Sequence, residues 1–417
     1  MANVLVTPTW VMKEIGRRLV NNLKFANNVN RSYSDEYVVQ GAKVGYTVNA
    51  RLPQRYRVSK GQALNISNVI DAVVPITLTD QAHIGIEFGT ASLTMEVNSY
   101  KDRYIAPAVD SLVNAVDFDG LQRMYQSVFM SVGAPGTIPG SSGTNPTAAN
   151  IVYLGAGVKL SNAAVPVDGR VAILSPEMHA YLAIANATLF NPASAISEQY
   201  KSGMFASKAL GIDEWFMSQN VCTHSTGTIT GTPTVTTAPT EGATTVVTGA
   251  WASAAASHPV KGDVVQFAGC YAINPLSYQS TGQLQDFVVT ATPTNDASGN
   301  VTIPVYPAFK VTGDDATCSA FPAATAAVTT FGAVNTYSLK TSPQGLVYHP
   351  DAFALVMADL EMPGGLWVSE RISSKTLGIS VRFLKDYNVM TDQSPARVDL
   401  LYGWKAVRPE LACRVAG

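Results

Sequence analysis

Residues 220–249 read NVCTHSTGTITGTPTVTTAPTEGATTVVTG, a stretch rich in threonine and glycine in which Glu241 is the only charged residue at pH 7. The chain on either side, KALGIDEWFMSQ (208–219) and QGLVYHPDAFALVMADL (344–360), has the mixed composition of ordinary packed protein. Between them, helical periodicity is absent and Gly, Pro, Asn and Asp separate short β-prone runs: TITGTPTVTT, TTVVTG, DVVQFAG, QDFVVTA, NVTIPVY and ATAAVTTF. This pattern predicts a small all-β barrel or sandwich, residues 222–341, inserted into an α+β body.

The composition of the 417-residue chain indicates a surface that other subunits cover. Hydrophobic residues make up 47% and charged residues only 14%, where about 25% charged is usual. The net charge of −2 argues against a dedicated nucleic-acid binder. Residues 1–60 hold ten Lys and Arg against three Asp and Glu, whereas residues 61–140 hold three against eight. A basic front and an acidic middle suit head-to-tail contact between copies, although chance and solvated surface explain the pattern equally well.

Cysteine usage and the amino-terminal sequence bear on the compartment. The four cysteines, Cys222, Cys270, Cys318 and Cys413, are far apart and form no CxxC, which predicts reduced thiols. Cys222 and His224 make one C-x-H with no second ligand pair at zinc spacing, so we predict no metal site. The start, MANVLVTPTWVMKEIGRRLV, does not have the features of a signal peptide, and no apolar run of about 18 residues occurs that would span a membrane.

The front of the chain predicts a helix and a long hairpin arm. Apolar residues within 8–28 recur at the spacing of an amphipathic helix. Residues 44–58 and 72–88 alternate and are rich in β-formers, so we predict two long strands with the polar SKGQALNISN at the tip. Such an arm cannot bury both faces on its own body, so it is expected to contact a neighbouring copy; the alternative is a plain surface hairpin. The residues expected to make that contact are Arg51, Arg55, Arg57 and Lys60.

Regular elements are also predicted on both sides of the module. Apolar periodicity over 99–132 predicts one long helix, ended by GAPGTIPGSSGTNP. RVAILSPEMHAYLAI (170–184) predicts a strand that leads into a helix, with Ser175 as the N-cap. Beyond the module we expect a helix at 351–360, followed by strands around 365–370, 378–390 and VDLLYGWKAVRP.

Signatures of catalysis and of cofactor binding are absent from the sequence. GAGVKL (155–160) has two glycines of a dinucleotide-binding motif but Leu160 in place of the third, and no Walker A or HExxH motif occurs. Ser175 has no glycines at the flanking positions of a nucleophile elbow. The five histidines have no partner at catalytic spacing. We therefore predict a protein that is not an enzyme, with no catalytic, cofactor-binding or metal-binding residues.

Several stretches together carry a resemblance that covers most of residues 40–417. They are ITLTDQAHIGIEF, the segment 99–135 with its end SVGAPGT, VAILSPEMHAYL, LFNPASAISEQYKSGMFASKALGIDEWFMSQNV, HPVKGDVVQFAGCYAINPLSYQSTGQLQDFVV, LVYHPDAFALVMADLEMPGG and RVDLLYGWKAVRPELACRV. The fifth is the most telling, with a Lys-Gly-Asp turn and a Phe-Ala-Gly strand. In this order and spacing they resemble the major coat proteins of tailed bacteriophages, in the subgroup of short-tailed phages whose coat protein carries an inserted β domain.

The resemblance implies an α+β fold of the HK97-like capsid type. This fold has an N-terminal arm, an extended E-loop hairpin, a long spine helix and an apical domain, here with an inserted all-β barrel. The expected division is 1–40, N-terminal arm; 41–98, E-loop hairpin and start of the peripheral domain; 99–149, spine helix and peripheral domain; 150–221, first part of the apical domain; 222–341, inserted β-barrel domain; 342–417, second part of the apical and peripheral domains.

The implied function is that of a major capsid protein, which self-assembles into the icosahedral shell around phage double-stranded DNA. Expected partners are other copies in hexamers and pentamers, a scaffolding protein and a portal in a procapsid that expands on packaging, DNA by weak nonspecific contact, and a decoration protein in some shells; no membrane is expected. Assembly would take place in the bacterial host cytoplasm, and the product would be the virion capsid. The basic residues expected to face the interior and its DNA are Lys13, Arg17, Arg18 and Lys24.

One departure and two alternatives accompany this resemblance. The N-terminal segment is basic here, so a scaffold contact that relatives make through acidic arm positions would have to differ. A shell protein of a non-viral nanocompartment with the same fold is one alternative, which the inserted domain disfavours. A β-rich adhesin or glycan-binding module is the other. Closed shells, an enzyme cargo, or a monomer with sugar affinity would distinguish the three.

Overall fold

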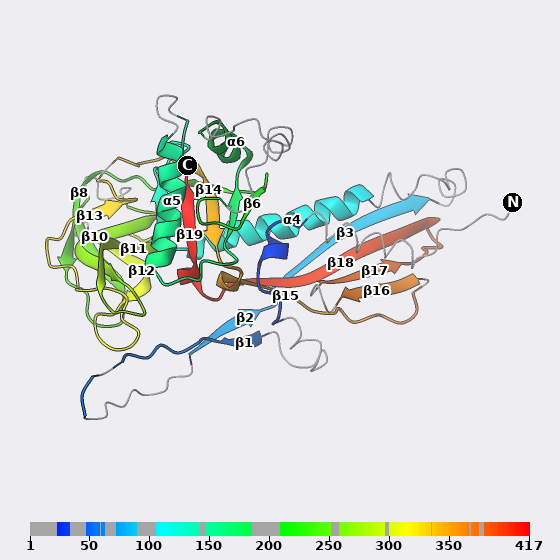
Figure 1. Cartoon of the computed structure of the whole chain (residues 1–417). Coiled ribbons are helices and arrows are strands. Elements are labelled where there is room, and N and C mark those ends of the chain that lie inside the picture. Colours follow the sequence, from blue (N-terminus) through cyan, green and yellow to red (C-terminus); the bar gives the residue numbers. More distant parts are fainter. Residues whose placement is uncertain are drawn as a thin grey trace, which may run out of the picture. The chain divides into compact units, whose positions relative to one another are not determined.

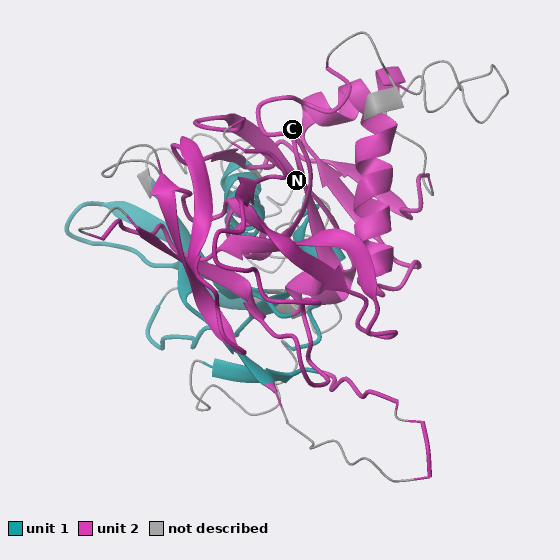
Figure 2. Cartoon of the chain, turned by 90° about the vertical axis from the view of Figure 1, so that its left-hand side faces the viewer, with its two compact units in different colours: residues 1–52, 73–121, 353–407 teal, residues 53–72, 122–352, 408–417 magenta. Residues whose placement is uncertain are grey.

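A computed structural model describes residues 23–33, 47–58, 60–62, 72–89, 106–141, 147–185, 209–251, 258–296, 300–334, 336–366, 368–374 and 379–417 (Figure 1). The chain divides into two compact units (Figure 2). Unit 1 holds residues 1–52, 73–121 and 353–407, and unit 2 holds residues 53–72, 122–352 and 408–417. Each unit is built mainly from strands in the described ranges, and each is described by itself below.

Unit 1 is built on a sheet around one long strand, β18 (Gln393–Ala406). β15 (Phe353–Met357) and β17 (Ile379–Lys385) both pair with β18, and all of these pairs are antiparallel. β16 (Val368–Ser374) extends the sheet beyond β17. β3 (Asp80–Gly89) pairs with β18 along the whole length of β3. The predicted strands near 365–370, 378–390 and VDLLYGWKAVRP are therefore confirmed.

The helix α4 (Ala106–Met124) anchors the amino-terminal part of the described chain within unit 1. Asp117 on this helix accepts the backbone N–H of Phe25 at 3.0 Å. Phe25 is fully buried and stacks on Trp404, with ring centroids 5.1 Å apart. Gly120 is required beside this stack, because a Cβ there would lie 2.5 Å from the Trp404 ring. The packing therefore depends on residues from three distant parts of the sequence.

The base of the predicted hairpin is formed by β1 (Thr47–Arg51) and β2 (Val73–Thr77), which pair antiparallel. The hairpin is shorter than predicted, because residues 52–58 form no strand and the second predicted strand divides after β2. The physical reason is that β2 pairs with β1, whereas β3 pairs with β18 in another sheet. A small buried core supports the hairpin base: Ala50, Ile76, Leu78, Ala354, Val356 and Val407.

In unit 2, one sheet combines strands from both sides of the predicted insertion. Its order is β4-β19-β14-β5-β6, and β7 also pairs with β14. The bounds are β4 (Met130–Gly133), β5 (Val171–Leu174), β6 (Glu214–Met217), β7 (Thr223–Ser225), β14 (Thr341–Tyr348) and β19 (Ala412–Ala416). The helix α6 (Pro176–Ala185) follows β5, and the Ser175 hydroxyl accepts the backbone N–H of Met178 at 3.2 Å. The predicted strand, helix and N-cap are thus confirmed.

The second sheet of unit 2 lies within residues 231–330 and has the order β13-β10-β11-β12-β9-β8. Its strands are β8 (Gly231–Thr237), β9 (Ala243–Trp251), β10 (Val264–Ile273), β11 (Ser280–Val289), β12 (Val301–Phe309) and β13 (Val328–Thr330). Val235 on β8 donates its backbone N–H to Ala326 at 2.9 Å, just before β13, so the two edges of the sheet meet. Each β-prone run of the sequence overlaps one of these strands, which confirms the strand predictions. The bounds of an inserted domain stay a prediction.

The interior of this six-stranded sheet is apolar and aromatic. Phe267, Phe287 and Phe309 are fully buried, and their ring centroids lie 4.5 to 5.6 Å apart. Alternate residues of β12 point inward, as the pattern of buried and exposed positions shows. Burial of this cluster is the main force that holds the sheet together.

The long helix predicted over 99–132 is confirmed only over 106–124, and the helix predicted at 351–360 is wrong. α4 ends at Met124, and a 3-10 turn and β4 follow, so the periodic apolar residues near 130 belong to a sheet. Residues 99–105 lie outside the described residues. The segment 351–360 contains η5 (Pro350–Ala352) and then β15 rather than a helix. All five residues of β15 are buried, and a short apolar run of this kind does not distinguish a buried strand from a helix.

Two further elements complete the comparison with the sequence. The helix α5 (Thr147–Asn162) was not predicted, and it contains the GAGVKL stretch. Its glycines and small residues obscured the helical pattern. Most of the predicted helix 8–28 lies outside the described residues, and its last part forms the 3-10 turn η1 (Ala26–Asn28).

Candidate assembly surface and buried polar junction

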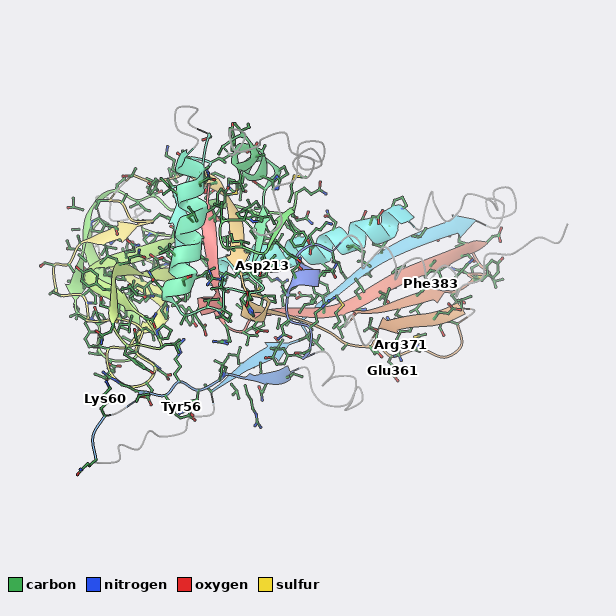
Figure 3. All side chains as sticks on the ribbon, viewed as in Figure 1. Tyr56, Lys60, Asp213, Glu361, Arg371 and Phe383 are labelled. Atoms are coloured by element: carbon green, nitrogen blue, oxygen red, sulfur yellow. The ribbon has the colours of Figure 1, made fainter. Side chains whose placement is uncertain are left out.

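The four basic residues predicted to contact a neighbour are divided between the two units. Arg51 is the last residue of β1 in unit 1. Arg55, Arg57 and Lys60 lie on the segment that leaves β1, in unit 2. We call residues 53–62 the arm segment; Figure 3 shows Tyr56 and Lys60 on it. Arg51 is exposed at the end of β1. On the arm segment Arg57 and Lys60 are exposed and Arg55 is partly buried, so this segment is strongly basic.

Two of these arginines contact their own chain. Arg55 Nη2 lies 3.9 Å from Glu410 Oε1. The Arg57 guanidinium lies over the Tyr278 ring, 5.3 Å from its centroid. Burial and the nearby Asp314 raise the pKa of Tyr278, whereas the two arginines lower it. These contacts hold the arm segment on unit 2 and leave charged groups at the surface.

The N-terminal basic residues are described only in part. Lys13, Arg17 and Arg18 lie outside the described residues. Lys24 is exposed between two buried residues, Leu23 and Phe25. The sequence prediction that these residues face DNA is not tested by a single chain.

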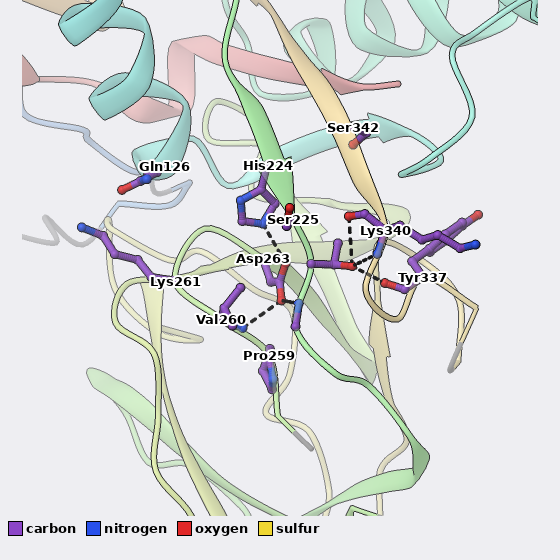
Figure 4. A network of polar contacts seen from close by, with 12 residues as sticks. Gln126, His224, Ser225, Pro259, Val260, Lys261, Asp263, Tyr337, Lys340 and Ser342 are labelled. Atoms are coloured by element: carbon purple, nitrogen blue, oxygen red, sulfur yellow. Dashed lines mark hydrogen bonds and ion pairs between the residues drawn. The ribbon is translucent and has the colours of Figure 1, made fainter. Parts of the chain in front are cut away.

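Asp263 in the Lys-Gly-Asp turn is the centre of a buried polar network (Figure 4). His224 Nε2 lies 2.8 Å from Asp263 Oδ1. The backbone N–H groups of Gly227 and Val260 donate to Oδ2 at 3.0 and 2.9 Å. Gly262 has a φ of +95°, and a Cβ there would lie 3.1 Å from the His224 ring, so the turn needs glycine. One carboxylate therefore fixes β7, the turn and the start of the module together.

His224 is held from both sides of its ring. Its Nδ1 lies 3.3 Å from the Tyr125 hydroxyl, and the two rings are T-shaped with centroids 5.7 Å apart. Burial raises the pKa of Tyr125. Ser225 follows His224 in the chain, and its hydroxyl forms a hydrogen bond with the Thr341 hydroxyl at 2.7 Å and not with the histidine. Tyr125 and Asp263 together fix the orientation of the buried His224 ring.

Asp286 on β11 forms a second buried centre. It pairs with Lys159 of α5, and Gln266 Nε2 donates to its Oδ1 at 2.5 Å. The backbone N–H of Ser131 on β4 donates to Oδ2 at 3.2 Å, and Lys159 also donates to the Ser131 carbonyl at 2.7 Å. We call the groups around Asp263 and Asp286 the polar junction. A cavity of about 240 Å³ adjoins it, lined by Ser131, Val132, Gly133, Lys159, Val264, Gln266, Asp286 and Phe331.

Arg414 on β19 lies beside the polar junction and is fully buried. Its guanidinium lies 5.2 Å from the centroid of the Phe331 ring. None of its three guanidinium nitrogens has a hydrogen-bond partner among the described residues. Burial lowers the pKa of Arg414 to about 10, and the charges of Asp263 and Asp286 oppose this change. The two carboxylates thus balance a buried cation at a distance.

The sequence did not single out Lys159, Asp286 or Arg414, and it marked Asp263 only as part of the Lys-Gly-Asp turn. Their partners lie far away in the chain, so no local spacing marks them. The one available signal is a single arginine inside the apolar run of β19. For Cys222 and His224, the described residues contain no group of three or more His, Cys, Asp and Glu that could hold a metal. Across the described ranges, none of the helices has the length and apolar character that a membrane span requires.

Comparison with known proteins identifies the family. The family model described as "P22 coat protein - gene protein 5" matches residues 2–417. No curated protein matches the chain. Among solved structures, that of Mycobacterium phage Che8 is 13% identical, with 94% of this chain and 90% of that chain covered and a TM-score of 0.47.

Two further solved structures are similar over most of the chain. The capsid of cyanophage P-SCSP1u is 12% identical over 89% of this chain and 84% of that chain, with a TM-score of 0.44. The virus-like particle from Pyrococcus furiosus is 9% identical over 97% of each chain, with a TM-score of 0.40. The family model, which covers nearly the whole sequence, decides the matter: the chain belongs to the P22 coat protein family and is a major capsid protein that forms an icosahedral shell.

Proposed function

We propose that this coat protein assembles in the host cytoplasm with a scaffolding protein and a portal, as a procapsid that expands when double-stranded DNA enters. We further propose an HK97-like fold in which residues 222–341 are an inserted β-barrel domain. The protein's role is structural rather than catalytic, and a decoration protein is a further partner to test. Self-association and a place in the virion capsid follow from the family itself.

The pairing of β7 with β14 supports the insertion. Thr223 to Ser225 lie opposite Thr341 to Pro343, so the proposed domain starts and ends at neighbouring strands. Thr226 and Lys340 close this neck, because Thr226 N–H donates to the Lys340 carbonyl and Lys340 N–H donates to the Thr226 hydroxyl, both at 2.9 Å (Figure 4). Domains are tolerated as insertions where the two connection points lie close together.

The insertion is tested by expressing residues 222–341 alone. We expect β-type circular dichroism and a cooperative thermal transition, because this range contains the aromatic core and all six strands of its sheet. Fragments that start and end a few residues earlier or later guard against a badly chosen boundary. A disordered chain in every one of them would contradict an autonomous domain.

The exposed basic arm surface carries the proposal of an intersubunit contact. Arg51, Arg55, Arg57 and Lys60 would meet acidic groups of a neighbour, the residues 87–119 being the candidate partner region. Single exposed ion pairs contribute about 0–1 kcal/mol, but the contact is repeated at every interface of the shell. The contacts of Arg55 and Arg57 within their own chain hold the arm segment, and this supports the proposal.

Charge reversal tests the arm. Replacing all four residues with Glu should block shell formation with scaffold in sedimentation and electron microscopy, while far-UV circular dichroism stays unchanged. A matched pair of variants controls for net charge: Arg57→Glu with Lys60→Glu, against Lys261→Glu with Lys340→Glu, where all four side chains are exposed. Normal shells from the fourfold variant, or equal defects in the two pairs, would contradict the assignment.

The interior role of the N-terminal segment is a separate proposal. Lys13, Arg17, Arg18 and Lys24 would contact packaged DNA weakly, without sequence preference. Filter binding with short duplexes should give micromolar or weaker affinity that falls with salt, and replacing the four with Ala should make the salt dependence shallower. Duplexes of different sequence serve as controls. Sequence-specific binding that salt does not weaken would contradict this role.

A further inference from the structure

Cys270 and Cys318 lie together in the core of the six-stranded sheet. Both side chains are fully buried and belong to the same apolar cluster. All four cysteines of the chain are buried thiols rather than disulfides in this structure. The other two lie elsewhere: the Cys222 sulfur contacts the Asn220 carbonyl, and the Cys413 sulfur contacts the Arg414 carbonyl.

The backbone brings the two cysteines to the same place. Cys318 forms an antiparallel bridge with Ala272, two residues after Cys270 on β10. The Ser319 N–H donates to the Tyr271 carbonyl at 2.9 Å and fixes this register. Residues two apart on a strand point to the same face, so Cys270 and Cys318 are diagonal neighbours on one face. The pairing of β10 with β11 is irregular between Gln266 and Tyr271, so Cys270 lies where the ladder between the two strands is interrupted.

The two thiols form a donor and acceptor pair. The side chains are hydrogen-bonded to each other, and this bond lowers the pKa of Cys318. The same bond, together with burial, raises the pKa of Cys270. Of the two thiols, Cys318 is therefore the one that ionises more readily. The thiolate is the species that attacks a disulfide.

We propose that Cys270 and Cys318 are a redox pair that closes into an intramolecular disulfide when the coat protein meets a small-molecule disulfide as oxidant. The Cys318 thiolate attacks one sulfur of the oxidant, breaks its S–S bond and releases one thiolate. Cys270 then loses its proton and attacks the Cys318 sulfur of the mixed disulfide, which expels the second thiolate. The two protons of the cysteines end on the two released thiols, so two cysteines are oxidised and one oxidant molecule is reduced.

Access to the pair depends on the segment that carries Cys318. Residues 310–327 join β12 to β13 and contain no helix or named strand. Local opening of this segment exposes both sulfurs without separating β10 from β11. Segments with little regular structure open at lower free energy than core strands. Oxidation of the folded protein should therefore be slow, and oxidation during folding should be fast.

Peptide mapping of the full-length protein tests the pair. The protein is incubated with oxidised glutathione, once folded and once during refolding from urea, and the remaining thiols are alkylated in denaturant. Trypsin leaves Cys270 in residues 262–310 and Cys318 in residues 311–340. We expect these two peptides to be joined, lighter by two hydrogens than their sum, and separated by dithiothreitol. Cys222 and Cys413 should remain alkylated.

Matched variants decide between a specific pair and random oxidation. Cys270→Ala and Cys318→Ala should each abolish the joined peptide, whereas Cys222→Ala should keep it. In the wild type, oxidation should raise the melting temperature by more than about 5 °C, since a disulfide across a long loop restricts the unfolded chain. Alkylated Cys270 and Cys318 in the refolded oxidised sample, or pairing with Cys222 or Cys413, would overturn the proposal.

Discussion

The six-stranded sheet and the arm segment both belong to unit 2, but different forces fix their structures. Among the described residues, fifteen buried side chains form the core of the sheet, and its two edges are joined by hydrogen bonds. None of residues 52–58 is buried, and the arm segment is held through an ion pair of Arg55 and a cation–π contact of Arg57. Burial of apolar area contributes far more than exposed charge pairs. Substitutions in the sheet should therefore change folding, and substitutions in the arm should change assembly.

The strongest test of this contrast is Phe287→Ala. Phe287 is fully buried between two other phenylalanines, so its truncation leaves a cavity and should cost about 3–5 kcal/mol. Urea unfolding followed by circular dichroism measures the loss. The matched control is Phe118→Ala on α4, because Phe118 is 42% exposed. Equal losses in the two variants would show that the aromatic cluster does not dominate the sheet.

A smaller effect is expected where the sheet meets α5 and β4. Asp286→Ala leaves Lys159, Gln266 and the Ser131 N–H without their acceptor, which should cost about 2–4 kcal/mol. Adding Lys159→Met should recover part of the loss, because the unpaired cation is then removed as well. Chemical denaturation of the two single variants and of the double variant gives the coupling free energy between Asp286 and Lys159. Purely additive losses would mean that the pair does not act as a unit.

Outside the sheet, Tyr153→Phe tests a buried polar group without a partner. The Tyr153 ring meets Trp215 edge-on, and its hydroxyl has no hydrogen-bond partner among the described residues. Removing the hydroxyl should stabilise the protein by about 1 kcal/mol at pH 7.

Burial raises the pKa of Tyr153, so the wild type should also lose stability as the pH rises above about 10. Stability falls with rising pH because the Tyr153 hydroxyl releases its proton at a lower pH in the unfolded state than in the folded state. Thermal melts at pH 7 and at alkaline pH should show a smaller loss for the phenylalanine variant. The same alkaline loss in both proteins would assign the effect to other groups.

The smallest effect on folding is expected in the arm segment. Arg57→Ala removes the contact with Tyr278 and should cost about 0.5–1 kcal/mol locally. Cleavage by chymotrypsin after Tyr56, which is 61% exposed, should then be about two- to fivefold faster. Lys60→Ala is the control, because it changes the charge of the same segment without touching Tyr278. Identical rates in all three proteins would show that the contact does not hold the segment.

The same contrast explains how much the sequence could predict. The strands of the six-stranded sheet follow local alternation between turn residues, and each β-prone run overlaps one of them. The Ser175 cap is equally local. The arm was predicted as two long strands because alternation persists past Arg51, although the partner strand turns away after Thr77.

Local sequence patterns could not predict contacts between residues that are far apart in the chain. Lys159 and Asp286 are 127 residues apart, and nothing in either neighbourhood marks the pair. The apolar run of β15 was taken for a helix because its burial depends on strands from other parts of the chain. Arg414 stands out in the sequence only as one arginine within an apolar run, and its complete burial is known only from the structure.

The neck formed by β7 and β14 gives the proposed inserted domain a defined mechanical weakness. The two segments that lead into and out of the proposed domain leave the β7–β14 pair at the same end. There the hydrogen bonds between Thr226 and Lys340 form a clasp. A force that pulls the six-stranded sheet away would therefore load these hydrogen bonds one after another, as in a zipper, rather than all at once in shear. Peeling would open the clasp first and then three paired residues, while the strands inside the sheet bear little load. The neck would thus yield before the sheet it carries.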